Sequence, residues 1–403
     1  MKAPRLNPVQ VAAIRKAVSD QPHPRLLWDG SDRGTILANV ASPGLCRELA
    51  AQLRFRCEAY LDRGHKQYLD LEAYDSMALF NLPGQHLLSR IMEELAFAGW
   101  LLNETRYTDR AKQIVLRRVR EAFQTEAGPD PDYSHCRSPL GIGSTGCPFA
   151  TTADLLRPVL SRSEWAEVVA HVRDYYLAYA RRSFFERARI HSPGFNKTLY
   201  GMCAIGLLAL VVAEAIPNDE LNEAVSEAVR SAFGYVREAM DDDGGTYEGT
   251  GYGAICVHQA IQLGEALRRH GLPELSRYEP LHRHGRWMTS LLAPKGGTIN
   301  LGDSIGPDNI FSSILLLARW HDDPVLRWAY LRGLGRPDHA AGPYGDLFNL
   351  WLASLPTQIA WYEPVAPVQS PDHAGWPLAN HAEGYGVITF RTGWQKESLL
   401  AVL

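Results

Sequence analysis

The stretch that decides the fold reads YGMCAIGLLALVVAEAI and runs from Tyr200 to Ile216. Its residues are apolar at almost every position, so every side of a helix built from it would be apolar. At this length the stretch falls short of the roughly 20 residues that span a bilayer. We therefore expect a helix that is fully buried inside a soluble protein.

The segment that follows predicts a different kind of helix. Between Leu221 and Met240 apolar residues recur every three or four positions, which places one stripe on one face. Residues 254–269 repeat this pattern and end in RRHG, with basic residues in the last turn and a glycine beyond them. Alternation of amphipathic and fully buried helices predicts helical hairpins arranged in two concentric layers.

The same periodicities predict helices through most of the chain. They cover residues 45–61, 85–102, 109–123, 163–185, 198–216, 221–240 and 254–269, with shorter helices after Leu281, Asn309 and Pro324. Residues 134–146, SHCRSPLGIGSTG, are rich in glycine. They lack the GxxxxGK[ST] pattern of a phosphate loop, and we interpret them as a substrate-cleft loop or an ordinary connection.

The pattern changes near residue 355. The following residues are rich in Pro, Ala, His and Trp and show no helical period, and YGVITFRTGW and SLLAVL then read as β-strands separated by a turn. We expect a helical domain over residues 1–355, and a linker with the start of a truncated β domain over 356–403.

Composition narrows the class of protein. The chain is 46% hydrophobic and 21% charged, with a formal net charge of −4 and a pI near 6.4. These values favour neither a nucleic-acid partner nor an anionic membrane. No secretory signal or membrane-spanning stretch is evident, and the six cysteines show no CxxC pair. We expect a cytoplasmic protein, or a periplasmic one whose leader has been removed.

Six stretches, in order, resemble motifs of the heparinase II/III-like and alginate lyase group of polysaccharide lyases. They are HPRLLW (23–28), LAFAGWLLNETRYTDRA (95–111), FNKTLYGMCAIGLLAL (195–210), DGGTYEGTGY (243–252), GGTINLGDS (296–304) and GYGVITFRTGW (384–394). The resemblance implies a mainly α protein, with an (α/α) toroid followed by the first strands of an antiparallel β-sandwich. It also implies cleavage of 4-linked uronic-acid glycans by β-elimination, so the expected partner is an acidic poly- or oligosaccharide.

The loop MDDDGGTYEGTGYG, residues 240–253, carries the first candidate site residues. The resemblance makes Tyr252 the proton donor to the departing O4. A base role for the same phenol would need cationic or hydrogen-bond-donating neighbours. Glu248 is expected to orient this tyrosine or bind sugar hydroxyls, and Tyr247 to stack on the sugar ring. The alternatives are a first-turn aromatic for Tyr252, a helix-capping carboxylate for Glu248, and a solvated turn for the three aspartates.

The second candidate group precedes the buried helix. By resemblance, the amide of Asn196 neutralises the uronate carboxylate, which lets the C5 proton leave. The family usually has a second Asn or a His beside this residue, and here Lys197 could supply the missing charge. His191 is a candidate for a second carboxylate contact or a base. The alternative for Asn196 is an N-cap of the helix that begins near Thr198.

A third candidate, Asp303 of the NLGDS loop, could anchor the cleft wall or bind sugar hydroxyls. His282 and His284 are two residues apart and lie on different faces of a helix, so we predict no metal site in this chain. In the family a catalytic histidine and metal-binding residues come from the β-sandwich, beyond the strands present here.

Two other functions fit the same pattern. A glycoside hydrolase on a helical toroid would use two carboxylates, with Glu248 and Asp303 as the pair to measure. A non-catalytic glycan-binding domain would need neither a proton donor nor a base.

Overall fold

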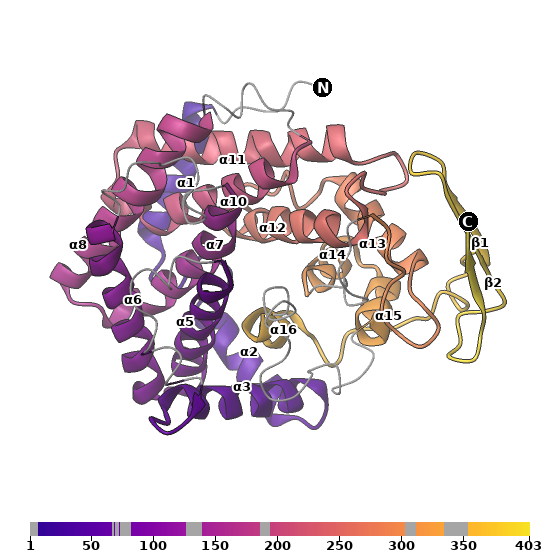
Figure 1. Ribbon diagram of the computed structural model, residues 1–403, viewed down its shortest axis with the longest axis horizontal. Coiled ribbons are helices and arrows are strands. Elements are labelled where there is room, and N and C mark those ends of the chain that lie inside the picture. The colour runs from indigo at the N-terminus through magenta and orange to yellow at the C-terminus, as the bar shows by residue number, and fades with distance from the viewer. Residues whose placement is uncertain are drawn as a thin grey trace.

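The computed structural model describes residues 7–66, 68, 72, 82–125, 139–185, 194–302, 312–333 and 354–403. The protein is mainly helical, and one small sheet lies at its C-terminal end (Figure 1). The α-helices are α1 (Pro8–Asp20), α2 (Gly30–Ala41), α3 (Leu45–Leu61), α5 (Leu82–Leu102), α6 (Thr105–Thr125), α7 (Pro139–Leu156), α8 (Arg162–His171), α10 (Asn196–Val211), α11 (Asn218–Ala239), α12 (Gly249–Arg269), α13 (Glu279–Ser290), α14 (Ser313–His321), α15 (Pro324–Gly333) and α16 (Leu355–Trp361).

The helices form two concentric layers, as the sequence predicts. In the inner layer each helix packs on the next in the order α5, α7, α10, α12, α14 and α16, and α16 packs back on α5 to close the ring. Helices α6, α8, α11, α13 and α15 lie outside this ring and alternate with the inner helices along the chain (Figure 1). The expectation of an (α/α) toroid is confirmed.

Burial agrees with the predicted pattern in α10 and in part of α11, but not in α12. In α10 every residue from Thr198 to Val211 is buried, which confirms the prediction from its all-apolar sequence. Helix α11 buries Leu221, Val225 and Val229 of the predicted stripe, while Phe233 is half-buried and the exposed residues lie only near the two ends of the helix. Helix α12 was predicted to be amphipathic, but every residue from Gly249 to Leu267 except Tyr252 is buried, because this helix belongs to the inner layer. Within the described residues, no helix is long and apolar enough to cross a membrane.

Helix α7 corrects the interpretation of residues 134–146 as a loop. The helix begins at Pro139, so the described part of this stretch, residues 139–146, is helical and belongs to the inner ring. Its glycines allow close packing against α10: a Cβ on Gly143 would lie 2.1 Å from Cδ1 of Tyr200, and one on Gly146 would lie 2.9 Å from Cβ of Ala204. Glycine therefore serves helix contact here, at the usual cost in helix propensity.

Two other regions differ from the predicted helices. The predicted helix over 163–185 is α8 followed by two π-helical segments, Val172–Leu177 and Ala180–Phe185. The predicted linker begins inside α16, whose seven residues are too few to show a helical period. Most of α16 is nevertheless buried, and it packs on α3 and α5. The division of the chain into two domains stays a prediction.

The C-terminal sheet contains both predicted strands and one more. Strands β1 (Ala379–Ala382), β2 (Val387–Arg391) and β3 (Leu400–Val402) form an antiparallel sheet in that order. The added strand β1 pairs Ala382 with Val387, and its sequence ANHA has none of the β-branched residues that favour strands. The sheet contacts the toroid near the end of α13, where Arg391 donates to the carbonyl of Ser290.

Candidate functional site

Asn196 lies at the N-terminus of the inner helix α10. It is the first residue of the helix, after the N-cap Phe195, and the helix start has no side-chain cap. The alternative role of Asn196 as N-cap is therefore wrong by one position. Instead, its backbone N–H donates a hydrogen bond to Oε1 of Glu248 at 3.1 Å.

Glu248 connects the starts of two neighbouring inner helices. It is the N-cap residue of α12, yet it makes no side-chain bond to its own helix. Its carboxylate instead accepts from the first N–H of α10, a position where the helix dipole favours negative charge. Burial raises the pKa of Glu248, against the opposing effect of the Asn196 hydrogen bonds and the Lys197 charge.

Two polar atoms at this junction are buried without a protein partner. Oδ1 of Asn196 and Oε2 of Glu248 find no hydrogen-bond donor among the described residues. Buried polar atoms are rarely left unpaired, since each costs about 1–3 kcal/mol. Within the described residues, these two hydrogen-bond acceptors are therefore unsatisfied.

Tyr252 lies on the face of α12 that turns toward α10. It is in the first turn of α12 and is half-buried. Cys256 follows one turn later, and its Sγ lies 3.7 Å from the carbonyl oxygen of Asn196. Residues four apart share one side of a helix. Glu248 and Cys256 both contact Asn196, so Tyr252, four residues from each, is expected on the same side of α12.

Tyr235 of α11 lies behind this group and was not predicted. Its side chain is fully buried, and burial together with the nearby Cys256 thiol and Glu248 carboxylate raises its pKa well above the usual range. Only the packing of α11 on α10 and α12 places this phenol near Glu248. Its position in the sequence does not distinguish Tyr235 from any other core tyrosine.

The loop before α12 holds Glu248 through a close backbone contact. Gly249 has φ of 75°, and a Cβ there would lie 2.0 Å from the carbonyl oxygen of Leu301. Thr250 ties the loops further, since its N–H donates to the Leu301 carbonyl at 3.1 Å. Only glycine permits both this backbone conformation and this approach.

The loop before α12 and the loop after α13 share one turn structure, which was not predicted from the sequence. A β-bridge joins Met240 to Thr246, and an equivalent bridge joins Leu292 to Thr298. Each turn ends in the letters GGT and follows the end of an outer helix, α11 or α13. The repeated GGT was the signal that could have revealed it.

Two of the three aspartates of the first loop, Asp241 and Asp243, have side-chain partners. Oδ1 of Asp241 accepts the N–H groups of Asp243 and Gly245 at 3.0 and 2.7 Å. Oδ2 of Asp243 accepts the N–H of Glu383 at 2.9 Å, which fastens the β1–β2 turn to the toroid. The interpretation as a merely solvated turn is thus incomplete.

The remaining described candidates lie at the surface near the junction. Tyr247 is 61% exposed, which leaves its ring free to stack on a ligand. Lys197 is also exposed, and its Nζ lies 5.8 Å from the ring centre of Phe195. The C-terminal sheet adds Tyr385: a Cβ on Gly302 would lie 3.4 Å from its hydroxyl and 3.3 Å from Cα of Gly249.

His191 and Asp303 lie outside the described residues. The roles predicted for them, and the separation of Glu248 from Asp303, therefore stay predictions. Gly302, the residue before Asp303, is described and lies against Gly249.

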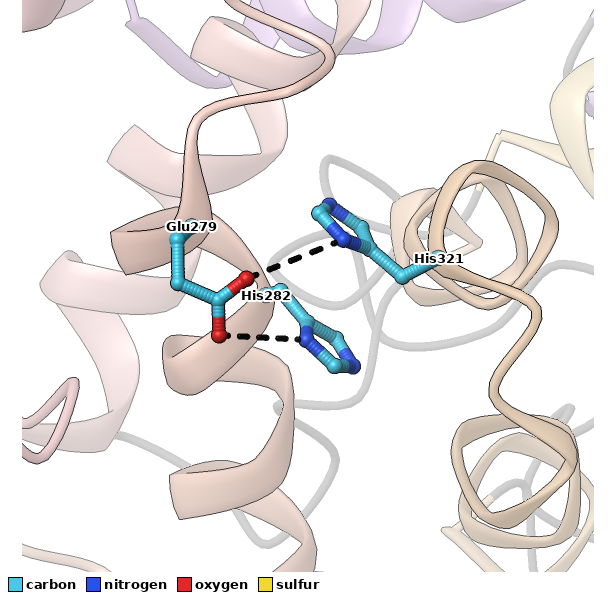
Figure 2. A group of neighbouring side chains, drawn as sticks. All are labelled: Glu279, His282 and His321. Carbon is cyan, nitrogen blue, oxygen red and sulfur yellow. Dashed lines mark ion pairs between the residues drawn. The ribbon is translucent and has the colours of Figure 1, made fainter.

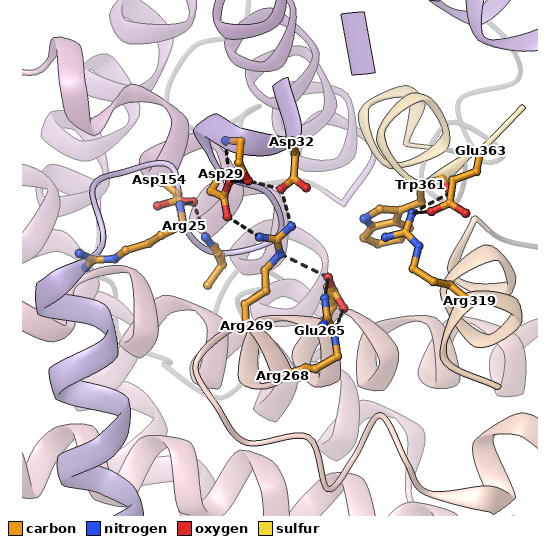
Figure 3. A network of polar contacts seen from close by, with 12 residues as sticks. Arg25, Asp29, Asp32, Asp154, Glu265, Arg268, Arg269, Arg319, Trp361 and Glu363 are labelled. Carbon is orange, nitrogen blue, oxygen red and sulfur yellow. Dashed lines mark hydrogen bonds and ion pairs between the residues drawn. The ribbon is translucent and has the colours of Figure 1, made fainter. Parts of the chain in front are cut away.

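The HPRLLW stretch is bound to helix α7 through Asp154, which lies beside Arg25 in Figure 3. The N–H groups of Arg25 and Leu26 both donate to Oδ2 of Asp154 at 2.8 Å, and His23 bonds Oδ1 at 2.6 Å. Burial alone would lower the pKa of His23, but its hydrogen bonds to Asp154 and Glu214 raise it. This motif therefore anchors the N-terminal segment on α7.

A second network in Figure 3 joins α12 to the start of α2. Arg269 binds Asp29 at 2.8 Å and Glu265 at 3.3 Å, and it also pairs with Asp32. Asp29 is the N-cap of α2. The network fixes the C-terminal end of α12, the helix whose opposite end carries Tyr252.

Comparison with known proteins gives a distant structural likeness. No family model matches the sequence. The chain is similar to the crystal structure of a heparan sulfate lyase HepC mutant from Pedobacter heparinus, with 15% sequence identity and a TM-score of 0.49. The match covers 98% of this chain and 55% of that one, so the chain spans about half the length of the lyase.

Proposed function

We propose that this protein is a polysaccharide or oligosaccharide lyase that cleaves 4-linked uronic-acid glycans by β-elimination. The observation that supports the proposal is the contact of Asn196 with Glu248 and Cys256, on the side of α12 where we expect Tyr252. The order of motifs that resemble the polysaccharide lyases supports it further.

The proposed chemistry needs three groups. The amide of Asn196 hydrogen-bonds the C6 carboxylate and stabilises the negative charge that develops as C5 loses its proton. The phenol of Tyr252 donates its proton to O4 as the C4–O4 bond breaks. His191 is the proposed second carboxylate contact or base, and Tyr252 itself is the alternative base.

The charges around the junction are compatible with an acidic ligand. Lys197 contributes a solvent-accessible positive charge, and two helix N-termini add partial positive charge. Glu248 opposes a uronate only when ionised, and burial raises its pKa. Its free oxygen and the exposed ring of Tyr247 supply contacts for neutral parts of the sugar.

A glycoside hydrolase is the second candidate. The half-buried Glu248 favours it, because a carboxyl group with a raised pKa is suited to act as a general acid. Such an enzyme would pair it with Asp303 at a separation of about 5–5.5 or 6.5–9.5 Å.

The test is to incubate the protein with defined 4-linked uronate oligosaccharides and record both ultraviolet absorbance and new reducing ends. A lyase forms a conjugated double bond with each cleavage, so both signals rise together. Reducing ends without absorbance would identify a hydrolase, and binding without either signal would identify a glycan-binding domain. Both outcomes would refute the proposal.

Variants then test the assigned roles. Asn196→Ala removes the amide but keeps the backbone N–H that binds Glu248, so its expected loss of about 10²–10³ in rate reports on the side chain alone. Tyr252→Phe is expected to lose about 10²–10⁴. The control Tyr278→Phe makes the same change at the start of α13 and should retain full activity. Full activity of Tyr252→Phe would refute the acid assignment.

A further inference from the structure

Three side chains from α13 and α14 form a cluster of metal-ligand type (Figure 2). Glu279 and His282 lie three residues apart on α13, and His321 is the last residue of α14. Their potential ligand atoms all lie within 4.8 Å of one another. Nδ1 of His282 is 3.6 Å from one oxygen of Glu279, and Nδ1 of His321 is 3.9 Å from the other.

His282 is oriented by a carboxylate on its other side. Its Nε2 lies 2.9 Å from Oδ2 of Asp323. Burial alone would raise the pKa of Asp323, but hydrogen bonds from His282 and from the N–H of Val325 lower it. A proton on Nε2 satisfies the ionised Asp323 and leaves the lone pair on Nδ1 directed toward Glu279. This carboxylate–histidine arrangement is the one that commonly supports a metal-bound imidazole.

His321 lies face to face with His282. Their ring centroids are 4.3 Å apart and the rings are nearly parallel, at 4°. Nε2 of His321 is buried and has no hydrogen-bond partner among the described residues.

We propose that Glu279, His282 and His321 bind a divalent transition-metal ion of the zinc type, with water completing the coordination. Two imidazoles and one carboxylate suit zinc or cobalt better than magnesium or calcium, which prefer oxygen ligands. The bound ion would join the outer helix α13 to the inner helix α14. This site is independent of the proposed lyase activity.

Binding requires a small closure of the cluster. Tetrahedral coordination at about 2.0–2.1 Å places ligand atoms about 3.4 Å apart. Glu279 is 60% exposed at the first residue of its helix, so its side chain can move inward. The two rings must also turn out of their stacked arrangement, because the lone pairs of parallel rings lie in parallel planes and cannot meet at one ion. Arg286, whose positive charge lowers the pKa of Asp323, would repel the bound cation.

The sequence predicted no metal site because it offered only His284 as a partner for His282. His284 points to a different part of the fold, where its Nδ1 lies 2.9 Å from the carbonyl oxygen of Gly244. The partner is His321, from a separate helix, which only the packing of α13 on α14 brings close.

The test uses the full chain, stripped of metal with a chelator and titrated with Co²⁺ and then Zn²⁺ near neutral pH. We expect saturation at one ion per chain and the strong visible absorption of low-coordinate cobalt, lost when zinc is added. The thermal midpoint should rise with zinc concentration, because the ion binds only the folded protein.

Four variants define the site. Glu279→Gln and His321→Gln should each weaken binding at least ten-fold, and Asp323→Asn should weaken it about 10–100-fold by disorienting His282. Asn can still cap α15, so Asp323→Asn leaves that helix start intact. His373→Gln, which alters an exposed histidine of the C-terminal segment, should bind as the unaltered protein does.

Each outcome decides the proposal. Absence of saturable cobalt binding, or equal affinity in Glu279→Gln and the unaltered protein, would overturn it. Circular dichroism of each variant checks that it is folded. If His321→Gln does not fold, the exposed Glu279→Gln still gives the decision.

Discussion

Replacement of Gly249 by alanine tests the contact that holds the candidate site together. Gly249 has φ of 75°, and its added Cβ would meet the Leu301 carbonyl oxygen at 2.0 Å. The left-handed backbone conformation costs alanine about 1–2 kcal/mol. The overlap cannot be relieved by a side-chain rotation, because the obstructing atom belongs to the backbone, and it adds about 1–3 kcal/mol.

The control lies just beyond the other end of the same helix. Gly271 has φ of 83°, and no atom lies within 4 Å of the position of its Cβ. Gly271→Ala therefore measures the backbone cost alone. We expect losses in the free energy of unfolding of about 1–2 kcal/mol for Gly271→Ala and about 2–5 kcal/mol for Gly249→Ala.

Urea denaturation followed by circular dichroism measures both losses, and the difference between them is the decisive quantity. Equal losses in the two variants would show that the Leu301 carbonyl oxygen does not lie 2.0 Å from the position of a Cβ at residue 249. Gly249→Ala should also reduce lyase activity if the proposed function holds, because the displaced loop carries Glu248.

Three further changes test the packing and electrostatics of the toroid. Burial raises the pKa of Glu93 to about 7 from an ordinary 4.5. The folded protein therefore retains a proton that the unfolded chain releases. This difference in protonation stabilises the fold below pH 4.5, and the stabilisation is lost as the pH rises toward 7. Glu93→Gln should therefore gain up to about 3 kcal/mol relative to the unaltered protein between pH 5 and 8, and equal pH profiles in urea denaturation would contradict the burial argument. Gly143→Ala should lower stability despite better helix propensity, because Tyr200 obstructs the new methyl group. The control Gly34→Ala in α2 meets no atom within 4 Å and should gain up to about 1 kcal/mol in stability. Thermal melts that show a gain in both variants would refute the α7–α10 contact. Asp154→Asn removes a charged acceptor shared by Arg25, Leu26 and His23 and should cost about 2–3 kcal/mol in urea denaturation, and an unchanged midpoint would show that the HPRLLW contacts are not stabilising.

Sequence alone determined that α10 is buried on every side, but it predicted an amphipathic α12, which is buried from Gly249 to Leu267 except at Tyr252. The all-apolar stretch from Tyr200 has only one stable environment, and the stripe of α11 needs one apolar neighbour on one side. Strands β2 and β3 were also predicted, since β-branched and aromatic residues between turns favour strands. These are properties of a segment and its solvent, so local sequence suffices.

Only the tertiary structure decided the contacts between segments. The glycines of α7 resemble a loop until α10 is placed against them, and Glu248 resembles a cap of α12 until the start of α10 lies beside it. The pairing of His282 with His321 depends in the same way on two separate helices meeting. Each of these contacts joins residues far apart in the chain. The number of residues between them does not determine how close they lie in the folded protein.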